Sequence, residues 1–553
     1  MTGEVRVKAE GRKSSNLLPV WLALGTGFLL FLCFPGSAGF WPAAWVALVP
    51  LLLAIRNVSP GRAARLGLLA GMIHYVSLLY WIIIVLGRYG NLPWWISVPA
   101  LLLLALYMSC YLALFCALMS RVWKQKEILL VWVGPFLWVG LDYIRSFLFS
   151  GFPWQDLAYS QYKALLLIQI ADVAGHYGVT FLIVLVNCVT TLLFVLWRDN
   201  RSVAQSSLSV LMTLRIRKAW FYGVLPTLCI MLAVMTYNFL RYQQISEVVE
   251  SSQKMKIALV QGNIEQDQKW SPAMRLETIE IYTELSEQAI AQGDESPTLL
   301  VWPETALPFL ISDNPYFNTL KKQLITKEKI WLLSGAPFYE KIESPKSLKR
   351  KENFFSYNSA YLFTPEGEIG GRYDKQHLVP FGEYIPLSKY LPLPGPLVEN
   401  IGNFSAGKSG SPLSCQSAEI GVLICFESIF PKIARDWTSV GANLLVNITN
   451  DAWFGRSSAP WQHLSMAVFR AVENRRSLAR AANTGVSTII DPLGRMAEAT
   501  PLFQPAFLVA DAPLLQKKTI FVGFGYYFGL LCLLLCIAGL FVLKKVKQRR
   551  DVM

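Results

Sequence analysis

The sequence has little charge, few histidines and few cysteines outside apolar stretches. Only 16% of its 553 residues are Asp, Glu, Lys or Arg, whereas soluble proteins average about 25%. With 53% hydrophobic residues, the chain is neither an ordinary water-soluble globule nor a disordered polypeptide, which needs low hydrophobicity. The four histidines show no metal-ligand spacing, so we expect no metal site and no cofactor.

Seven of the nine cysteines lie within apolar stretches, where cysteine acts as a small apolar residue. Only Cys415 and Cys425 lie in the more polar part of the chain. An oxidising compartment would allow these two to pair, although the sequence around Cys425, described below, argues for a free thiol.

Apolar segments able to cross a bilayer, which takes roughly 20 helical residues, dominate the first 240 residues. A cleaved signal peptide is the alternative for the first segment, but no typical cleavage site follows it. The segment at 41–55 is short, and a re-entrant loop is its alternative. We predict a polytopic α-helical membrane bundle of eight spans, at 17–34, 41–55, 66–86, 94–119, 128–148, 179–197, 219–240 and 521–543.

The distribution of basic residues predicts the orientation of these spans. If eight spans alternate, one side carries 20 Lys and Arg and the short segments of the other side carry three. Because basic loops stay in the cytoplasm, both termini are predicted to be cytoplasmic and residues 241–520 to lie outside. Residues 241–520 contribute a net charge of −1, so the net +14 of the chain is a signal of topology and not of nucleic-acid binding.

These signals predict five parts along the chain. Residues 1–16 form a cytoplasmic tail, 17–240 a seven-span membrane domain, 241–520 a catalytic domain, 521–543 the eighth span and 544–553 a basic cytoplasmic tail.

Within 241–520, short apolar runs alternate with one clear helical stretch at 274–292, and a second helix is predicted over 461–482. This alternation, with hairpins mixed in, predicts an α/β sandwich with mixed sheets. Strands are predicted at 256–261, 298–302, 330–334, 357–364, 369–373, 419–424, 443–448 and 486–490.

Three reactive side chains follow strand ends, where catalytic residues are often found. Glu304 follows TLLVWP, Lys375 lies in YDKQHLVPFGE, and Cys425 follows GVLI. A deprotonated Cys can attack an acyl carbon, a carboxylate can take its proton, and a Lys can stabilise the oxyanion. Taken singly, a Cys at a strand end is more often a buried structural residue, and a Glu or Lys is more often solvated. Residue spacing alone therefore leaves open whether these three residues are catalytic or structural.

At these residues the segment from about 256 to 512 resembles the nitrilase, or carbon–nitrogen hydrolase, superfamily. That resemblance implies a four-layer α-β-β-α sandwich and a Glu304–Lys375–Cys425 triad. The whole chain resembles the bacterial apolipoprotein N-acyltransferase family, through KQHLVPFGEYIPL at 375–387, GFPW at 151–154 and NITNDAWFG at 447–455.

The resemblance implies an acyl transfer in two steps. Cys425 takes the sn-1 acyl chain of a phospholipid, typically phosphatidylethanolamine, as a thioester. The N-terminal amine of a diacylglyceryl-cysteine on an apolipoprotein then accepts it. The implied location is the bacterial inner membrane, with the catalytic domain in the periplasm, and we expect a monomer.

The resemblance also assigns supporting and substrate-contacting roles. Glu383 and Glu427 support the triad, with helix capping as the alternative for Glu427. Four further residues are expected to bind substrate or shape its loop: Trp270, Phe426, Asn450 and Trp453. Packing in the membrane interface is the alternative for Trp270, and a structural turn is the alternative for Asn450. The aliphatic loop at 390–397 is predicted to be a lid.

Two other functions use the same features. A membrane-tethered amidase would use the same triad with water as acceptor, although one span would suffice as its tether. A transporter or scaffold with an inactive outer domain would not require an intact triad.

Overall fold

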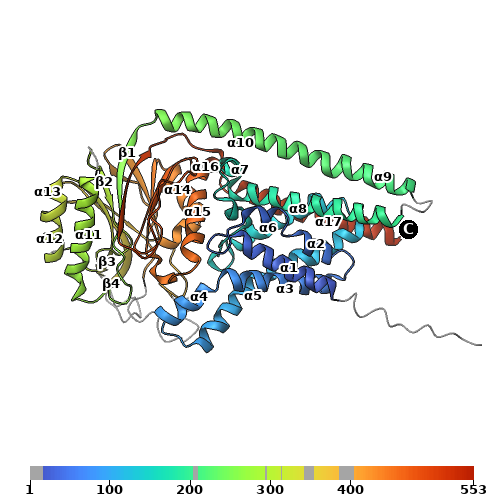
Figure 1. Cartoon of the computed structure of the whole chain (residues 1–553), viewed down its shortest axis with the longest axis horizontal. Helices are drawn as coiled ribbons and strands as arrows, with labels where there is room; N and C mark the ends of the chain where they lie inside the picture. Colours follow the sequence, from blue (N-terminus) through green and yellow to red (C-terminus); the bar gives the residue numbers. More distant parts are fainter. Residues whose placement is uncertain are drawn as a thin grey trace, which may run out of the picture.

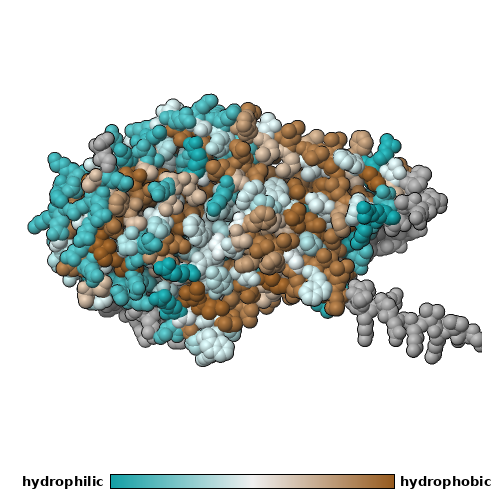
Figure 2. All heavy atoms as spheres, in the orientation of Figure 1, coloured by the Kyte–Doolittle hydropathy of each residue, from teal (hydrophilic) through white to brown (hydrophobic). Residues whose placement is uncertain are grey.

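The computed structural model describes residues 17–203, 209–292, 295–312, 314–341, 354–384 and 404–552. A helical part made of the N-terminal half and the C-terminal helix packs against a mixed α/β part (Figure 1). Hydrophilic residues concentrate on the surface of the α/β part and hydrophobic residues on the helical part (Figure 2). The predicted lid at 390–397 lies outside the described residues.

Most helices of the helical part overlap the predicted apolar segments. Among the described residues, three helical stretches, Trp94–Gln125, Ala171–Arg201 and Met212–Ser251, are long and apolar enough to cross a membrane. A bent pair, Pro60–Leu78 with Trp81–Tyr89, makes a fourth if it counts as one span. The helices are α1 (Leu18–Cys33), α2 (Val49–Ala54), α3 (Pro60–Leu78), α4 (Trp81–Ile84), α5 (Trp94–Gln125), α6 (Leu129–Arg145), α8 (Ala171–Val203), α9 (Ser209–Ala219), α10 (Leu225–Ser251) and α17 (Tyr527–Val552).

Three predicted spans differ from the structure in detail. The segment at 66–86 is not one straight helix, because it bends by 49° between α3 and α4. The segment at 41–55 is a 3-10 turn, Trp41–Trp45, followed by the six-residue α2. The last segment begins with a separate short helix, α16 (Ile520–Phe524), which ends where Gly525 adopts a positive φ of 65°.

Two mixed sheets face each other in the α/β part, with helices on both outer sides (Figure 1). The six-stranded sheet has the order β11-β1-β2-β3-β4-β5, and the five-stranded sheet has the order β10-β9-β8-β7-β6. Helices α11 (Met274–Ala291) and α12 (Pro315–Leu320) cover one face, and α14 (Pro431–Ser439) and α15 (Ala459–Asn474) cover the other. The predicted α-β-β-α sandwich is therefore confirmed.

The structure has the eight predicted strands and three more. Strands β6, β9 and β11 were not predicted as strands, and β11 closes the edge of the larger sheet by pairing antiparallel with β1. The strands are β1 (Lys254–Gln261), β2 (Leu299–Val301), β3 (Trp331–Lys341), β4 (Phe354–Phe363), β5 (Ile369–Asp374), β6 (Leu413–Cys415), β7 (Ala418–Ile424), β8 (Leu444–Thr449), β9 (Ser477–Ala482), β10 (Thr488–Ile490) and β11 (Ala506–Pro513).

The predicted helix over 461–482 is wrong in its second half. Helix α15 ends at Asn474, Arg475 takes a left-handed φ of 50°, and the chain continues as β9. All six residues of β9 are buried, and they pair with β8 on one side and β10 on the other. Its sequence, SLARAA, favours a helix locally because Ala, Leu and Arg are good helix formers. The sheet pairing, which is not visible in local sequence, therefore decides the conformation.

Candidate active site

Glu304 lies in the turn that follows β2, and three other segments hold it, two of them through its carboxylate. Its Oε1 accepts a hydrogen bond from Asn358 Nδ2 at 2.7 Å, and its Oε2 accepts one from the backbone N–H of Asn450 at 3.0 Å. Its main-chain oxygen accepts from the ammonium of Lys269 at 2.8 Å. The side chain is 6% exposed, so these contacts replace water.

Lys375 follows β5 and points its ammonium between two carboxylates. Lys375 Nζ is 2.8 Å from Glu383 Oε1 and 3.6 Å from Glu304 Oε1, and the residue is 1% exposed. Burial alone would lower the pKa of Lys375, but the charges of Glu383 and Glu304 outweigh it and raise the pKa above its ordinary value. The residue is therefore a cation throughout the physiological pH range.

Cys425 directly follows β7, where the backbone turns with a φ of 51°. A non-glycine residue rarely adopts this left-handed conformation, and such strained positions cluster at functional sites. Burial and the neighbouring charge of Glu304 raise the pKa of the thiol above its ordinary value, while Lys375 opposes the shift. Cys425 and Cys415 are both free thiols.

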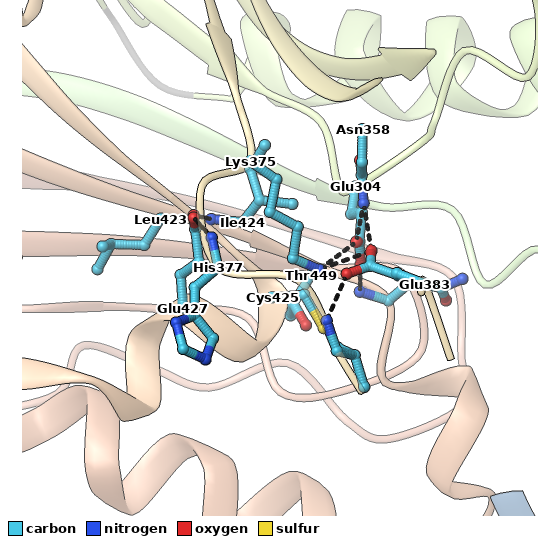
Figure 3. A network of polar contacts seen from close by, with 12 residues as sticks. Glu304, Asn358, Lys375, His377, Glu383, Leu423, Ile424, Cys425, Glu427 and Thr449 are labelled. Atoms are coloured by element: carbon cyan, nitrogen blue, oxygen red, sulfur yellow. Dashed lines mark hydrogen bonds and ion pairs between the residues drawn. The ribbon is translucent and has the colours of Figure 1, made fainter. Parts of the chain in front are cut away.

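Figure 3 shows these three side chains converging from the ends of different strands. The structure therefore brings together Glu304, Lys375 and Cys425, which are far apart in the sequence. Two carboxylates, Glu304 and Glu383, and two ammonium groups, Lys269 and Lys375, balance the charge of this buried site.

Asn358, on β4, connects the two carboxylates of the site. Its Nδ2 donates to Glu304 Oε1 at 2.7 Å and to Glu383 Oε1 at 3.0 Å. Glu383 also accepts from the backbone N–H of Val379 at 2.9 Å, which fixes the loop that carries it. Glu383 thus lies against Lys375 and, through Asn358, beside Glu304.

Glu427 is fully buried and ties the Lys375 loop to the turn at Cys425 (Figure 3). One carboxylate oxygen accepts from the Tyr373 hydroxyl at 2.8 Å and from the backbone N–H groups of Gln376 and His377 at 2.7 and 3.1 Å. The other accepts from the backbone N–H of Ile424 at 2.8 Å. Burial raises the pKa of Glu427 to about 7, although these hydrogen bonds and the charge of Lys375 favour the ionised form and lower it.

The four residues expected to contact substrate occupy different positions. Phe426 is buried, and its ring packs against Phe430 at 5.2 Å between ring centroids. Asn450 contacts Glu304 through its backbone, as described above. Trp453 packs its ring edge-on against Tyr89 of the helical part at 5.3 Å.

Trp270 is half-buried in the turn after β1, and its indole N–H has no hydrogen-bond partner among the described residues. Within that part of the chain, Trp270 makes no hydrogen bond or ring contact with the predicted triad. Its neighbour Lys269 does reach the site, through Glu304.

Sequence reasoning missed a buried polar cluster behind Cys425. His463 Nε2 lies 3.1 Å from the main-chain oxygen of Cys425 and 2.7 Å from the Ser428 hydroxyl, and its Nδ1 lies 3.2 Å from Asp451 Oδ1. Arg480 donates to Asp451 Oδ2 at 2.7 Å. Burial alone would raise the pKa of Asp451, but Arg480 and His463 hold it at about 2.

The helical part contacts the α/β domain next to this cluster. Trp154, in the GFPW motif, donates from its indole N–H to Gln462 Oε1 at 2.8 Å, and Trp81 of α4 donates to the same oxygen at 3.2 Å. The Phe152 ring stacks against Phe426 at 6.3 Å. The GFPW segment of the helical part thus contacts Phe426, the residue that follows Cys425.

Family models match most of the chain. The carbon-nitrogen hydrolase model matches residues 256–516, and the apolipoprotein N-acyltransferase N-terminal domain model matches residues 26–189. Among solved structures, an amidase from Nesterenkonia sp. aligns with 47% of this chain and 90% of its own, at 22% identity and a TM-score of 0.33. The family model, which covers residues 256–516, identifies the α/β part as a carbon-nitrogen hydrolase domain.

Curated relatives resemble the chain over nearly its whole length. An apolipoprotein N-acyltransferase from Geobacter metallireducens is 43% identical, over 96% of this chain and 95% of its own. Another, from Nitrosomonas europaea, is 33% identical over 94% of this chain and 95% of its own. The chain belongs to the apolipoprotein N-acyltransferase family of enzymes.

Proposed function

We propose that this chain transfers the sn-1 acyl chain of a phospholipid to the N-terminal amine of a diacylglyceryl-cysteine on an apolipoprotein, through a thioester on Cys425. The observation that carries the proposal is the convergence of Glu304 and Lys375 on a buried thiol, in a chain of this family.

In the first step, Glu304 takes the thiol proton while the sulfur of Cys425 attacks the ester carbonyl. The resulting oxyanion lies against the ammonium of Lys375. When the tetrahedral intermediate collapses, the C–O bond breaks and Glu304 returns the proton to the leaving alkoxide of the lysophospholipid. The enzyme then holds the acyl group as a thioester.

In the second step, the amine of the lipoprotein attacks the thioester carbonyl, with Glu304 accepting a proton from the nitrogen. The C–S bond breaks, the thiol of Cys425 regains a proton, and an amide is formed. Lys375 faces an oxyanion in both steps, so its permanent charge suits both.

Glu383 is a positioning residue in this scheme, because it contacts Lys375 at 2.8 Å. Glu427 positions the loops of Lys375 and Cys425 through its four hydrogen bonds. We assign Phe426, Asn450 and Trp453 to the pocket wall and Trp270 to the substrate loop.

We also propose that the enzyme is a monomer in the bacterial inner membrane, with eight spans and phosphatidylethanolamine as donor. We divide the chain into the five parts that the sequence predicts: 1–16, 17–240, 241–520, 521–543 and 544–553. The 20 basic residues of one side support cytoplasmic termini and a periplasmic catalytic domain. Highly exposed Trp94 and Trp220 support an interfacial aromatic belt at the ends of spans.

The thioester is the decisive intermediate to detect. The purified full-length protein is incubated with phosphatidylethanolamine without acceptor, quenched in acid, digested and analysed by mass spectrometry. We expect an acyl adduct on the peptide that carries Cys425, and its transfer when a diacylglyceryl peptide is added. Absence of the adduct, with hydrolysis of simple amides instead, would favour an amidase.

Two cysteine variants control this experiment. Cys425→Ser is expected to abolish both the adduct and transfer. Cys415→Ser changes the other cysteine of the catalytic domain, which is buried on β6, and is expected to keep both. Transfer retained in Cys425→Ser would contradict the mechanism.

A further inference from the structure

A cavity of about 240 Å³ lies where the end of α10 meets the segment that follows β11. Arg241, Gln244 and Val248 line it from α10, and Leu515 and Lys517 line it from the other side. None of the residues assigned above to catalysis lines this cavity, so it is a separate feature of the molecule.

The lining of this cavity carries excess positive charge. It contains three cations, Arg241, Arg475 and Lys517, and no acidic residue. Asp172, just behind, forms ion pairs with both Arg241, at 2.7 Å, and Arg475, at 3.0 Å. One carboxylate therefore serves two guanidinium groups, and Lys517 has no anionic partner among the described residues.

Hydrogen-bond donors in this lining remain available to a ligand. Arg241 uses Nε on Asp172 and Nη1 on Gln244 Oε1, while its Nη2 makes no bond to another described residue. Because Arg only donates, Gln244 must present its oxygen to Arg241, which leaves its amide N–H groups free to donate. A guanidinium, an ammonium and an amide N–H around one cavity suit the oxygens of a phosphate group.

The surface next to this cavity is apolar. Arg241 directly follows the apolar stretch of α10, in which Leu232 is 71% exposed and Leu240 is 57% exposed. Helix α10 runs along the outside of the helical part and continues to β1 (Figure 1). If the span at 219–240 crosses the membrane as proposed, the cavity begins at headgroup level and the exposed leucines face acyl chains.

We propose that this cavity binds the headgroup of an anionic phospholipid whose acyl chains lie along α10. The phosphate accepts hydrogen bonds from Arg241, Gln244 and Lys517. Because the three cations outnumber the single carboxylate of Asp172, the site favours a lipid with net negative charge over a zwitterionic one. This site is distinct from the acyl-donor site at Cys425. The lining of the cavity does not depend on the proposed topology; only its depth relative to the bilayer does.

Lipid binding to the full-length protein in neutral detergent tests this proposal. Native mass spectrometry measures binding of phosphatidylglycerol, of phosphatidylethanolamine with the same acyl chains, and competition by soluble glycerol 1-phosphate. We expect the wild type to prefer phosphatidylglycerol, and Lys517→Gln to weaken that binding by about fivefold, as for one basic side chain near an anionic surface.

Lys518→Gln is the matched control, since Lys518 donates to the main-chain oxygen of Ser439 and does not line the cavity. It is expected to bind as the wild type does. Equal binding by the Lys517→Gln and wild-type proteins, or equal binding of the two lipids, would overturn the proposal. Full competition by glycerol 1-phosphate would show a site for soluble phosphate esters and overturn it also.

A Cys425→Ser protein separates this site from the proposed catalytic function. It is expected to bind phosphatidylglycerol as the wild type does while lacking acyl transfer. Loss of that binding in Cys425→Ser would show that the bound lipid is the acyl donor, and would overturn the proposal of a second site.

Discussion

Replacing Asn358 by Asp should make acyl transfer depend steeply on pH. The amide of Asn358 donates to Glu304 at 2.7 Å and to Glu383 at 3.0 Å, in a site that excludes most water. A new carboxylate at this position would face two existing ones. Each hydrogen bond of the wild type would become a repulsion while the side chain kept nearly the same shape.

The size of this effect follows from the geometry. At an effective dielectric constant of about 20, two charges about 4 Å apart repel by about 4 kcal/mol, so two carboxylates contribute about 8 kcal/mol. Lys375 contacts the same oxygen of Glu383 as Asn358 does, so its ammonium lies within about 6 Å, and its attraction returns about 3 kcal/mol. The remaining 5 kcal/mol or so raises the pKa of the new carboxyl by about 3 to 4 units, to about 7 or 8.

Below that pKa the new carboxyl is neutral and donates to one of its neighbours, so part of the wild-type arrangement is restored. Above it, transfer is expected to fall about tenfold per pH unit, as the neutral fraction does. The assay is the rate of transfer from phosphatidylethanolamine to a diacylglyceryl peptide between pH 5.5 and 9, relative to wild type.

Asn358→Leu is the control, because Leu has a similar volume, no donor and no titratable group. It is expected to lower transfer at all pH values without adding a titration. If the Asp and Leu variants gave parallel pH profiles, the bridging role of Asn358 between the two carboxylates would be refuted.

Three further predictions follow from other parts of the site. In Gly335→Ala, the added carbon would lie 2.8 Å from the Cα of Glu304 and displace it, so we expect the rate of acyl transfer to fall about a hundredfold. In the control Gly410→Ala, nothing lies within 4 Å of the added carbon, and the rate should stay near that of the wild type. The pKa of Asp451 is lowered from its ordinary value of 3.8 to about 2, so its ionised form stabilises the fold by about 2 kcal/mol above pH 3.8, and this contribution is lost as the pH falls through 2. Thermal unfolding of Asp451→Asn between pH 2 and 5 should lack this decrease of stability with falling pH. The pKa of Glu427 is raised from 4.5 to about 7, so its neutral form stabilises the fold at low pH, and this contribution to the free energy of unfolding falls by about 3 kcal/mol as the pH rises from 4.5 to 7. Glu427→Gln should remove this decrease in the same unfolding assay.

The sequence is sufficient to predict the residues that follow buried strands. Glu304, Lys375 and Cys425 each come after an apolar run, where catalytic residues are often found. Their convergence was not predictable in the same way, because β2 and β5 belong to one sheet and β7 belongs to the other. The sandwich was also predictable, because its alternation of strands and helices is local. The helix over 461–482 failed because β9 is defined by its pairing with β8 and β10, which local sequence does not reveal.

Contacts between distant segments were beyond the reach of local patterns. Asn358 lies in the middle of the residues paired between β3 and β4, opposite Pro337, where an Asn gives no catalytic signal. His463 follows Cys425 by 38 residues and reaches its main-chain oxygen only because α15 packs behind the turn. In the sequence His463 is one of several polar residues of α15, and nothing local marks it as buried or identifies its partner.

The balance of charge in the site bears on when the proposed nucleophile is formed. Burial and Glu304 raise the pKa of Cys425, so the resting residue is a neutral thiol despite the nearby ammonium of Lys375. That ammonium already pairs with Glu383 and Glu304, so an unsolvated thiolate would have to compete with two carboxylates for it. Once Glu304 accepts the proton, one of those negative charges is gone and Lys375 is released to face the oxyanion. The proton transfer and the attack on the acyl carbon are thereby coupled: the charge that Lys375 stabilises moves from Glu304 to the reacting group, and the net charge of the buried site does not change.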